Sequence, residues 1–113
     1  MKYEIRLMDD ATEFVKKLTV KMRAKVLRTI GLLEQFGPQL PAPHAKSLKN
    51  GQGLKELRVK QGSDIVRLFY FHHKGKLYVA TSGYLKKTQK TNQREISRAI
   101  RLMNEFTGDP NHD

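Results

Sequence analysis

Residues 65–71 read Ile-Val-Arg-Leu-Phe-Tyr-Phe, and every side chain in this run except that of Arg67 is aliphatic or aromatic. A strand with one face in water alternates polar and apolar side chains, whereas a strand that is buried on both faces does not. The strand-like run, which spans residues 64–73, therefore predicts a central strand that is covered on both sides. Arg67 stands out in it, because a charged side chain is seldom fully buried without a partner.

Two further strand-like runs, residues 54–60 and 77–85, flank the central run. The connecting segments, residues 61–63 and 74–76, are three residues long and have a glycine in the middle. Loops of this kind join antiparallel strands. Residues 2–8 alternate polar and apolar side chains, which predicts one more strand at the start of the chain.

Three helices are expected from capping residues and from apolar spacing. Asp10 with Glu13 and Asn92 with Glu95 have the spacing of a capping box, and Thr19 is a further N-cap candidate. Each of these starts is followed by apolar side chains that recur every three to four residues, which is the spacing of one buried helix face. The first two helices are expected to form an antiparallel hairpin that lies on the sheet.

The predicted element order is strand, helix, helix, three strands, helix. Residues 37–53 contain three of the four prolines and are expected to form a loop, and the polar residues 107–113 are expected to form a frayed tail. A chain of 113 residues can build one two-layer core. We therefore expect a single α+β domain over residues 1–113, in which two N-terminal helices pack on a small, mainly antiparallel sheet.

Charge is concentrated in one part of the chain. The sequence has 22 Lys and Arg against 11 Asp and Glu, a formal net charge of +11. Residues 46–90 hold eleven of the cations and two acids, Glu56 and Asp64, and so carry +9 of this charge. Such a concentration predicts a polyanionic partner, with nucleic acid as the leading candidate, because a phosphate backbone engages several cations at once. General solubility is the alternative role.

The composition also excludes several classes of protein. The chain has no cysteine, which excludes a thiolate nucleophile and cysteine-containing metal sites and agrees with a reducing compartment. No apolar run approaches the roughly 18 residues of a membrane span, and the first residues lack the apolar segment of a signal peptide. We therefore expect a cytoplasmic protein that does not enter a membrane.

Five of the cations are candidate catalytic residues. Arg58 and Lys60 share one face of their strand, since side chains two residues apart point the same way. Arg67 follows on the neighbouring strand, and Lys86 and Lys87 lie at the end of the next one. When a phosphodiester is cleaved by the neighbouring 2′-hydroxyl, negative charge builds on the phosphate oxygens, and fixed cations stabilise that charge. The planar guanidinium of arginine can bind two of these oxygens together.

Two other roles remain open for these cations. They could bind nucleic acid without cleaving it. Arg67 could instead form a buried salt bridge with Glu56 or Asp64.

Further residues are expected to contact RNA. Tyr84 lies near the end of the last strand, where its ring could stack on a base or its hydroxyl could contact a phosphate, and filling the edge of the core is the alternative role. The other expected RNA-binding residues are lysines of the basic segment, namely Lys46, Lys49, Lys55 and Lys90.

No metal site and no cofactor are expected. The basic segment lacks the carboxylate pair of a two-metal nuclease. His72 and His73 are adjacent in a strand, so their rings point to opposite faces and cannot share one metal ion. His44 is a lone loop histidine, which could approach a phosphate as an acid or base but is more often simply solvated.

Three segments resemble those of a known protein family. Residues 53–58 read Gly-Leu-Lys-Glu-Leu-Arg, and residues 66–70 read Val-Arg-Leu-Phe-Tyr. Residues 83–91 read Gly-Tyr-Leu-Lys-Lys-Thr-Gln-Lys-Thr and are followed by Glu95-Ile96. This pattern covers nearly the whole chain and resembles the RelE/ParE superfamily of type II bacterial toxins, and within it the phage-derived HigB-like branch.

The resemblance implies the toxin of a toxin–antitoxin system, which cleaves mRNA on the ribosome as a metal-independent endonuclease and so inhibits translation. It also implies a cognate antitoxin, expected to be a helix-turn-helix protein. By position, Arg67 matches the arginine that holds the scissile phosphate. Arg58 and Lys60 match basic positions on the preceding strand, and Lys86 or Lys87 matches a cation at the end of the last strand.

The resemblance leaves other functions open. Val66 stands where many members have tyrosine, and no residue near the C-terminus matches the catalytic tyrosine of some relatives. The ParE branch shares the fold but inhibits DNA gyrase, so a gyrase inhibitor without nuclease activity is the alternative function. A plain RNA-binding module is a further one.

Overall fold

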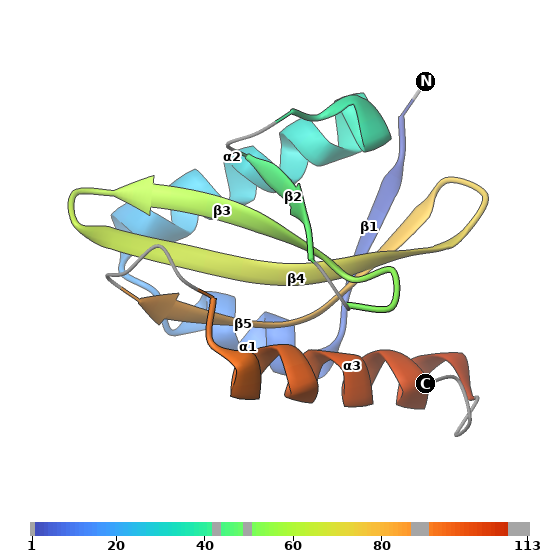
Figure 1. The fold of residues 1–113 in the computed structure, drawn as a ribbon. Helices are drawn as coiled ribbons and strands as arrows, with labels where there is room; N and C mark the ends of the chain where they lie inside the picture. The colour runs from blue at the N-terminus through green and yellow to red at the C-terminus, as the bar shows by residue number, and fades with distance from the viewer. Residues whose placement is uncertain (1, 42–43, 49–50, 87–90, 109–113) are drawn as a thin grey trace.

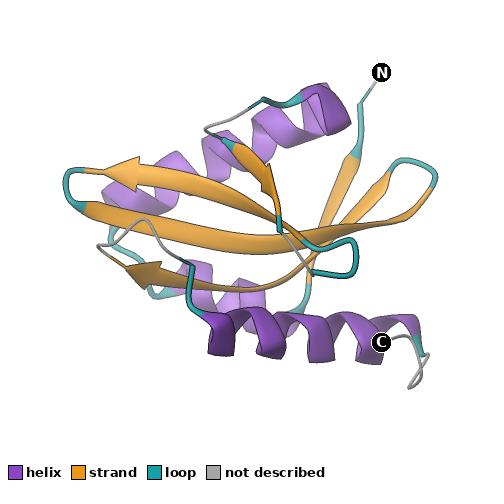
Figure 2. Cartoon of the chain, in the orientation of Figure 1, coloured by secondary structure: helices purple, strands orange, loops and turns teal. Residues whose placement is uncertain are grey.

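The computed structural model describes residues 2–41, 44–48, 51–86 and 91–108. Five strands form one sheet in the order β1-β5-β4-β3-β2, with helices on both of its faces (Figures 1 and 2). β1 (Glu4–Leu7) runs parallel to β5 (Leu77–Lys86). The remaining neighbours pair antiparallel and are β4 (Asp64–Lys74), β3 (Lys55–Gln61) and β2 (Ala45–Ser47). The expected α+β fold with a mainly antiparallel sheet is confirmed.

Two apolar clusters lie on opposite faces of the sheet. α1 (Asp9–Lys16) and α2 (Val20–Phe36) cover one face, which we call the α1/α2 face, and pack on side chains that include Leu68. α3 (Gln93–Thr107) covers the other, which we call the α3 face, and packs on side chains that include Phe69. Figure 1 shows the sheet between these two layers.

The central strand is β4, as its composition predicts. Residues 65–71 are all buried, and successive side chains point alternately to the α1/α2 face and to the α3 face. Arg67 belongs to this buried run. The central strand therefore places a charged side chain in the interior of the protein.

Two of the predicted helix starts are confirmed. The Thr19 hydroxyl accepts a hydrogen bond from the Met22 amide at 3.2 Å, and the Asn92 side chain accepts one from the Arg94 amide at 2.8 Å. Both side chains therefore satisfy an amide that the first helical turn leaves without a partner.

The predicted start of α1 is wrong. The helix begins at Asp9, and Met8 occupies the N-cap position without a side-chain hydrogen bond. The Met8 amide donates to the Ala80 carbonyl at 2.8 Å, so the chain stays attached to the sheet until the helix begins. Asp9 and Asp10 lie in the first turn, where carboxylates interact favourably with the helix dipole.

Two irregular segments are more ordered than expected. Within residues 37–53, Gly37–Gln39 forms a short 3₁₀ helix and Ala45–Ser47 forms β2, so a loop throughout this segment is wrong. α3 continues to Thr107, and Gly108 ends it in the left-handed conformation, so the frayed tail does not begin at residue 107. Residues 109–113 lie outside the described residues.

Three tyrosines pack together on the α1/α2 face. The Tyr78 ring lies 5.5 Å from that of Tyr3 and 5.5 Å from that of Tyr70, between ring centroids. Burial, with a smaller contribution from the neighbouring Tyr78, raises the pKa of Tyr70 to about 12. Burial also raises the pKa of Tyr78. The folded protein therefore favours the neutral phenols.

This cluster predicts a loss of stability at high pH. The Tyr70 phenol ionises from about pH 10 in the unfolded chain but only near pH 12 in the folded one, so its effect on the free energy of unfolding is absent below pH 10 and destabilising above it. Between pH 8 and pH 12, we expect the free energy of unfolding to fall by about 2 kcal/mol less in the Tyr70→Phe variant than in the parent protein. Urea unfolding at both pH values measures the difference. Lysines also titrate in this range, but equally in both proteins. An equal loss in the two proteins would contradict the assignment.

Candidate functional site

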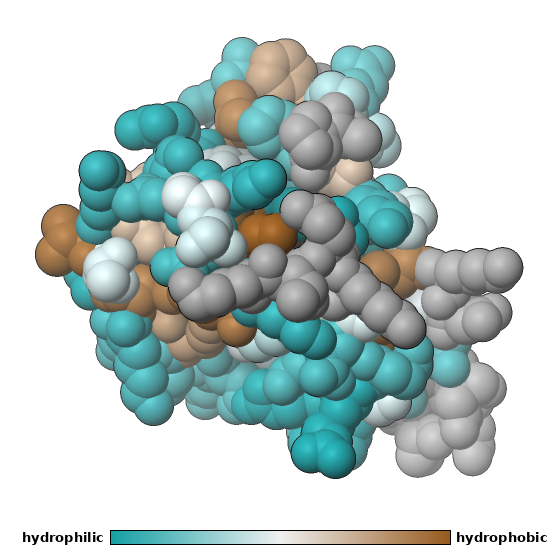
Figure 3. Space-filling view, turned by 60° about the vertical axis from the view of Figure 1, so that its left-hand side comes forward, coloured by the Kyte–Doolittle hydropathy of each residue, from teal (hydrophilic) through white to brown (hydrophobic). Residues whose placement is uncertain are grey.

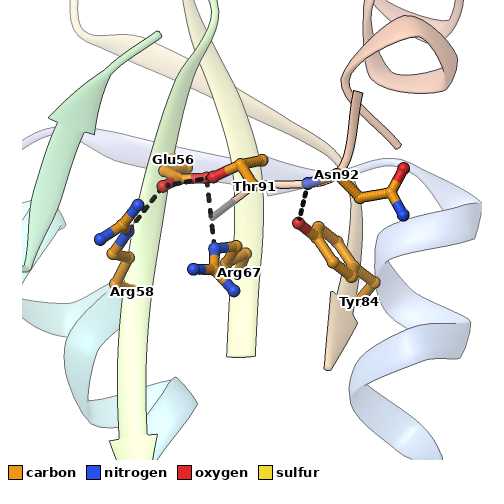
Figure 4. A network of polar contacts seen from close by, with 6 residues as sticks. All are labelled: Glu56, Arg58, Arg67, Tyr84, Thr91 and Asn92. Carbon is orange, nitrogen blue, oxygen red and sulfur yellow. Dashed lines mark hydrogen bonds and ion pairs between the residues drawn. The ribbon is translucent and has the colours of Figure 1, made fainter. Parts of the chain in front are cut away.

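One row of side chains crosses the α3 face from β3 to β5. Arg58 pairs with Arg67 across β3 and β4, and Arg67 pairs with Tyr84 across β4 and β5. Directly paired residues point to the same face, so these three side chains lie side by side (Figure 4). Glu56 lies two residues before Arg58 on β3 and points to this face as well.

The Glu56 carboxylate lies between the two arginines and has no exposed surface. Its Oε1 accepts a hydrogen bond from Arg58 Nε at 2.6 Å, and its Oε2 lies 3.9 Å from Arg67 Nε. A hydrogen bond between two charged groups at the first of these distances is among the strong ones. Glu56 therefore holds Arg58 through a hydrogen bond and Arg67 through an ion pair, whose Nε–Oε2 distance is too long for a hydrogen bond.

The segment that leads into α3 is attached to the same site. The Thr91 hydroxyl contacts both Glu56 oxygens, at 3.2 and 3.0 Å. The next residue, Asn92, donates its amide to the Tyr84 hydroxyl at 2.6 Å. Thr91 and Asn92 thereby connect the start of α3 to β3 and β5 across the row of arginines (Figure 4).

The ion pair that was one alternative for Arg67 is present. Both members of the Arg67–Glu56 pair are fully buried, and Tyr84 contributes a further contact, since its ring centroid lies 5.9 Å from Arg67 Cζ. A buried charge is costly unless it is paired, which gives Glu56 a direct structural role. The Tyr84 ring also stacks on that of Phe69 at 5.9 Å, so the tyrosine fills the edge of the core in this arrangement.

Exposure separates the two arginines. The Arg58 side chain is 19% exposed, whereas that of Arg67 is 0% exposed. A phosphate can approach Arg58 from solvent, but direct contact with Arg67 requires neighbouring side chains to move. Tyr84 and Thr91 are among those neighbours.

The structure brings three of the candidate lysines to the α3 face. Lys60 and Lys86 both pair with Ile65, one from each side, and so lie in the row next to Arg67. Lys46 on β2 pairs with Glu56 and shares its face. The side of the molecule in Figure 3 is largely hydrophilic, with apolar side chains in small separate patches.

The other candidate lysines do not join this group. Lys55 pairs with Tyr70 and points to the α1/α2 face, so it lies on the opposite side from the arginines. Lys49, Lys87 and Lys90 lie outside the described residues.

The sequence pattern indicated Glu56 only as one of two possible partners for Arg67, and it did not indicate Thr91. One signal could have identified Glu56, namely an acid among many cations, placed two residues before Arg58 and so on the same strand face. Thr91 carried no comparable signal, because its contact with Glu56 spans 35 residues of sequence.

The histidines at the end of β4 occupy different environments. The His72 ring contacts Tyr78 and the His73 ring contacts Phe106, which lie on opposite faces. Among the described residues, no group of three or more His, Asp or Glu side chains is placed to hold a metal ion. None of the helices in the described part of the chain is long and apolar enough to cross a membrane.

Replacement of Glu56 tests the role of its charge. Glu56→Gln keeps the size of the side chain but leaves two arginines without their shared carboxylate, and we expect it to lower the free energy of unfolding by about 3–5 kcal/mol. The matched control is Glu4→Gln, which removes a solvent-exposed carboxylate 3.3 Å from Arg6 and should change stability by less than about 1 kcal/mol. Urea unfolding measures the change in the free energy of unfolding for both variants. Similar changes in the two would show that the Glu56 charge does not stabilise the fold.

Comparison with known proteins identifies the family. The sequence model of the phage-derived Gp49-like proteins matches residues 13–104. Among curated protein sequences, none matches the chain.

Solved structures share the fold at low sequence identity. A mutant of the Escherichia coli toxin RelE in its free state has a TM-score of 0.67 and 17% identity, with 89% of this chain and 97% of that chain covered. The RelBE2 toxin–antitoxin complex of Mycobacterium tuberculosis has a TM-score of 0.58 and 20% identity, with 76% and 100% covered. The RelE–RelB complex of Pyrococcus horikoshii has a TM-score of 0.54 and 17% identity, with 80% and 100% covered. The chain therefore belongs to the phage-derived Gp49-like protein family and has the fold of the RelE toxins.

Proposed function

We propose that this protein is the toxin of a type II toxin–antitoxin system and that it cleaves mRNA on the ribosome in the cytoplasm. The observation that carries the proposal is the group of cations on the α3 face, where the partly exposed Arg58 pairs with the buried Arg67 and where Lys60 and Lys86 lie in the neighbouring row, on either side of Ile65. The RelE fold supports a toxin, because toxins of this fold have been solved with antitoxins.

The proposed reaction is an attack of the ribose 2′-hydroxyl on the adjacent phosphorus. The new bond joins the 2′-oxygen to phosphorus as the 2′-hydroxyl releases its proton to solvent. The bond to the 5′-oxygen breaks as that oxygen takes up a proton from solvent, and the products are a 2′,3′-cyclic phosphate and a free 5′-hydroxyl. Negative charge builds on the phosphate oxygens during this exchange. Cations fixed before the substrate binds stabilise it without further reorganisation.

Each residue has a distinct role in this proposal. Arg58 and Lys60 bind the RNA backbone from solvent, and Lys86 does so from the end of β5. Arg67 stabilises the transition state, and the Tyr84 ring and the Thr91 hydroxyl move aside to admit the phosphate. Glu56 is a positioning residue, which accepts a hydrogen bond from Arg58 and forms a buried ion pair with Arg67.

The proposed antitoxin is an acidic partner. Cations held close together repel one another, so a protein that places carboxylates near Arg58, Lys60 and Lys86 would relieve this repulsion and cover the site. The solved RelBE2 and RelE–RelB complexes support an antitoxin partner, and its acidic character is part of the proposal.

The sharpest test concerns Arg67. We expect Arg67→Ala to slow single-turnover cleavage of ribosome-bound mRNA by about 100-fold or more, the scale seen when one preorganised donor is lost, and to leave ribosome binding nearly intact. Arg67→Lys should restore little, because an ammonium lacks the planar fork. Arg101→Ala is the matched control, since that exposed arginine on α3 pairs with Glu105 away from the site.

Stability and cleavage must be measured on the same samples, because Arg67 also pairs with Glu56. A variant that melts lower but cleaves at the parent rate while folded would remove Arg67 from the active site. A parent protein that leaves ribosome-bound mRNA intact but inhibits DNA gyrase would overturn the proposed function.

A further inference from the structure

A pocket of about 390 Å³ opens at the edge of β3, beyond the end of β2. Among the described residues, the last main-chain hydrogen bond between the β2 segment and β3 joins the Arg58 amide to the His44 carbonyl at 2.9 Å. Further along β3, the Lys60 carbonyl accepts a hydrogen bond from Lys25 Nζ of α2 at 2.7 Å. Lys25 of α2 therefore binds the edge of β3 at a position where a neighbouring strand would otherwise pair. The pocket lies between this contact and the hydrogen bond of His44 with Arg58.

The pocket combines an apolar floor with several cations. Val59 and Thr29 are buried on the α1/α2 side and provide the floor, and Ile65 lines the pocket from the strand next to Lys60. The cations around it are Lys25, Arg58 and Lys60, and His44 also lines it. No carboxylate is among the described side chains that line it. Such a site matches a ligand with a flat apolar part and a negative charge.

Its size and charge narrow the ligand further. About 390 Å³ lies within the range of about 300–1,000 Å³ that is usual for small-molecule sites. Lys25 donates one of its N–H groups to a neutral carbonyl, and this contact does not compensate the positive charge of the ammonium. The apolar floor suits a nucleobase, and the Lys25 and Lys60 ammonium groups beside it suit a phosphate joined to that base.

Arg58 connects this pocket to the arginine row. Its side chain lines the pocket, and its Nε donates to Glu56 inside the row. An RNA strand that places one phosphate against Arg58 and Arg67 would therefore bring the adjoining nucleotide to the pocket. Lys25 lies outside the basic segment of residues 46–90, so charge distribution along the sequence did not indicate it.

We propose that this pocket binds the RNA nucleotide next to the scissile bond. The base lies against Val59 and Thr29, and its phosphate lies against Lys25 and Lys60. The choice of RNA as the source of this nucleotide rests on the proposed function, whereas the nucleotide site itself rests on the geometry of the pocket.

The test is a titration of the isolated, ¹⁵N-labelled protein, followed by NMR. The probes are the four nucleoside 5′-monophosphates, inorganic phosphate and a dinucleotide that is 2′-O-methylated and so cannot be cleaved. We expect saturable shifts of the Thr29, His44, Val59 and Lys60 amides with nucleotides. Binding of inorganic phosphate should be weaker, because it makes no contact with the apolar floor.

Two substitutions on α2 make the titration specific. Lys25→Ala should weaken nucleotide binding about tenfold, the loss expected for one charged hydrogen-bonding group. Lys21→Ala is the matched control, since Lys21 lies one helical turn earlier and does not line this pocket, and it should change the affinity by less than about twofold. Unchanged binding by Lys25→Ala, or shifts confined to other residues, would overturn the proposal.

The dinucleotide distinguishes an RNA site from a site for free nucleotides. It should bind more tightly than any mononucleotide, because its second unit reaches Arg58, and the opposite order would overturn the assignment to RNA. None of these measurements depends on cleavage. A pocket that binds nucleotides in a protein that does not cleave mRNA would contradict the proposed function alone, and cleavage by a protein whose pocket binds nothing would contradict this inference alone.

Discussion

The buried carboxylate of Glu56 is the charge on which the arrangement of the α3 face depends. β4 is covered on both sides, so the Arg67 guanidinium lies where water cannot solvate it. Desolvation of one ion in a protein interior costs several kcal/mol, and an opposite charge nearby offsets much of that cost. Glu56 supplies this charge to Arg67 and also accepts a strong hydrogen bond from Arg58. Two cations are thereby held a single strand spacing apart, although they repel each other.

The same carboxylate links the site to the helix that covers it. Thr91 donates to Glu56, and the next residue binds the Tyr84 hydroxyl, so the start of α3 is attached to β3 and β5. Any ligand that reaches Arg67 must displace some of these contacts. Binding at the arginine row and the position of the first turn of α3 are therefore coupled, which offers a physical route by which a partner bound at α3 could affect the site.

Local sequence patterns predicted those parts of the fold that depend on local physics. The apolar run of β4, the glycine-centred turns and the caps at Thr19 and Asn92 each follow from neighbouring residues, and all are confirmed. β2 has only three residues, too few to show a period, and it forms because β3 lies beside it. The parallel pairing of β1 with β5 joins two distant segments in the same way.

In the candidate site, too, only the features that follow from local spacing could be predicted. Spacing of two residues placed Arg58 and Lys60 on one face, and antiparallel turns brought Arg67 opposite them. The same spacing rule puts Lys55 on the other face, which the charge of the segment concealed. Two features depend on packing between elements that are distant in the sequence, namely the contact of Thr91 with Glu56 and the place of Lys25 in the pocket. Neither could be predicted from local sequence patterns.

The central claim is that the buried Glu56 carboxylate holds both arginines in place, Arg58 by a hydrogen bond and Arg67 by a buried ion pair. Hydrogen exchange of the arginine Nε–H groups, followed by NMR on the parent protein near neutral pH, tests it most directly. The Arg58 Nε–H is hydrogen-bonded and the Arg67 Nε–H is fully buried, and both kinds of group exchange slowly because exchange requires local opening. The structure predicts that the Arg58 and Arg67 Nε–H signals persist far longer than that of the exposed Arg101. Exchange of both signals as fast as that of Arg101 would contradict the claim.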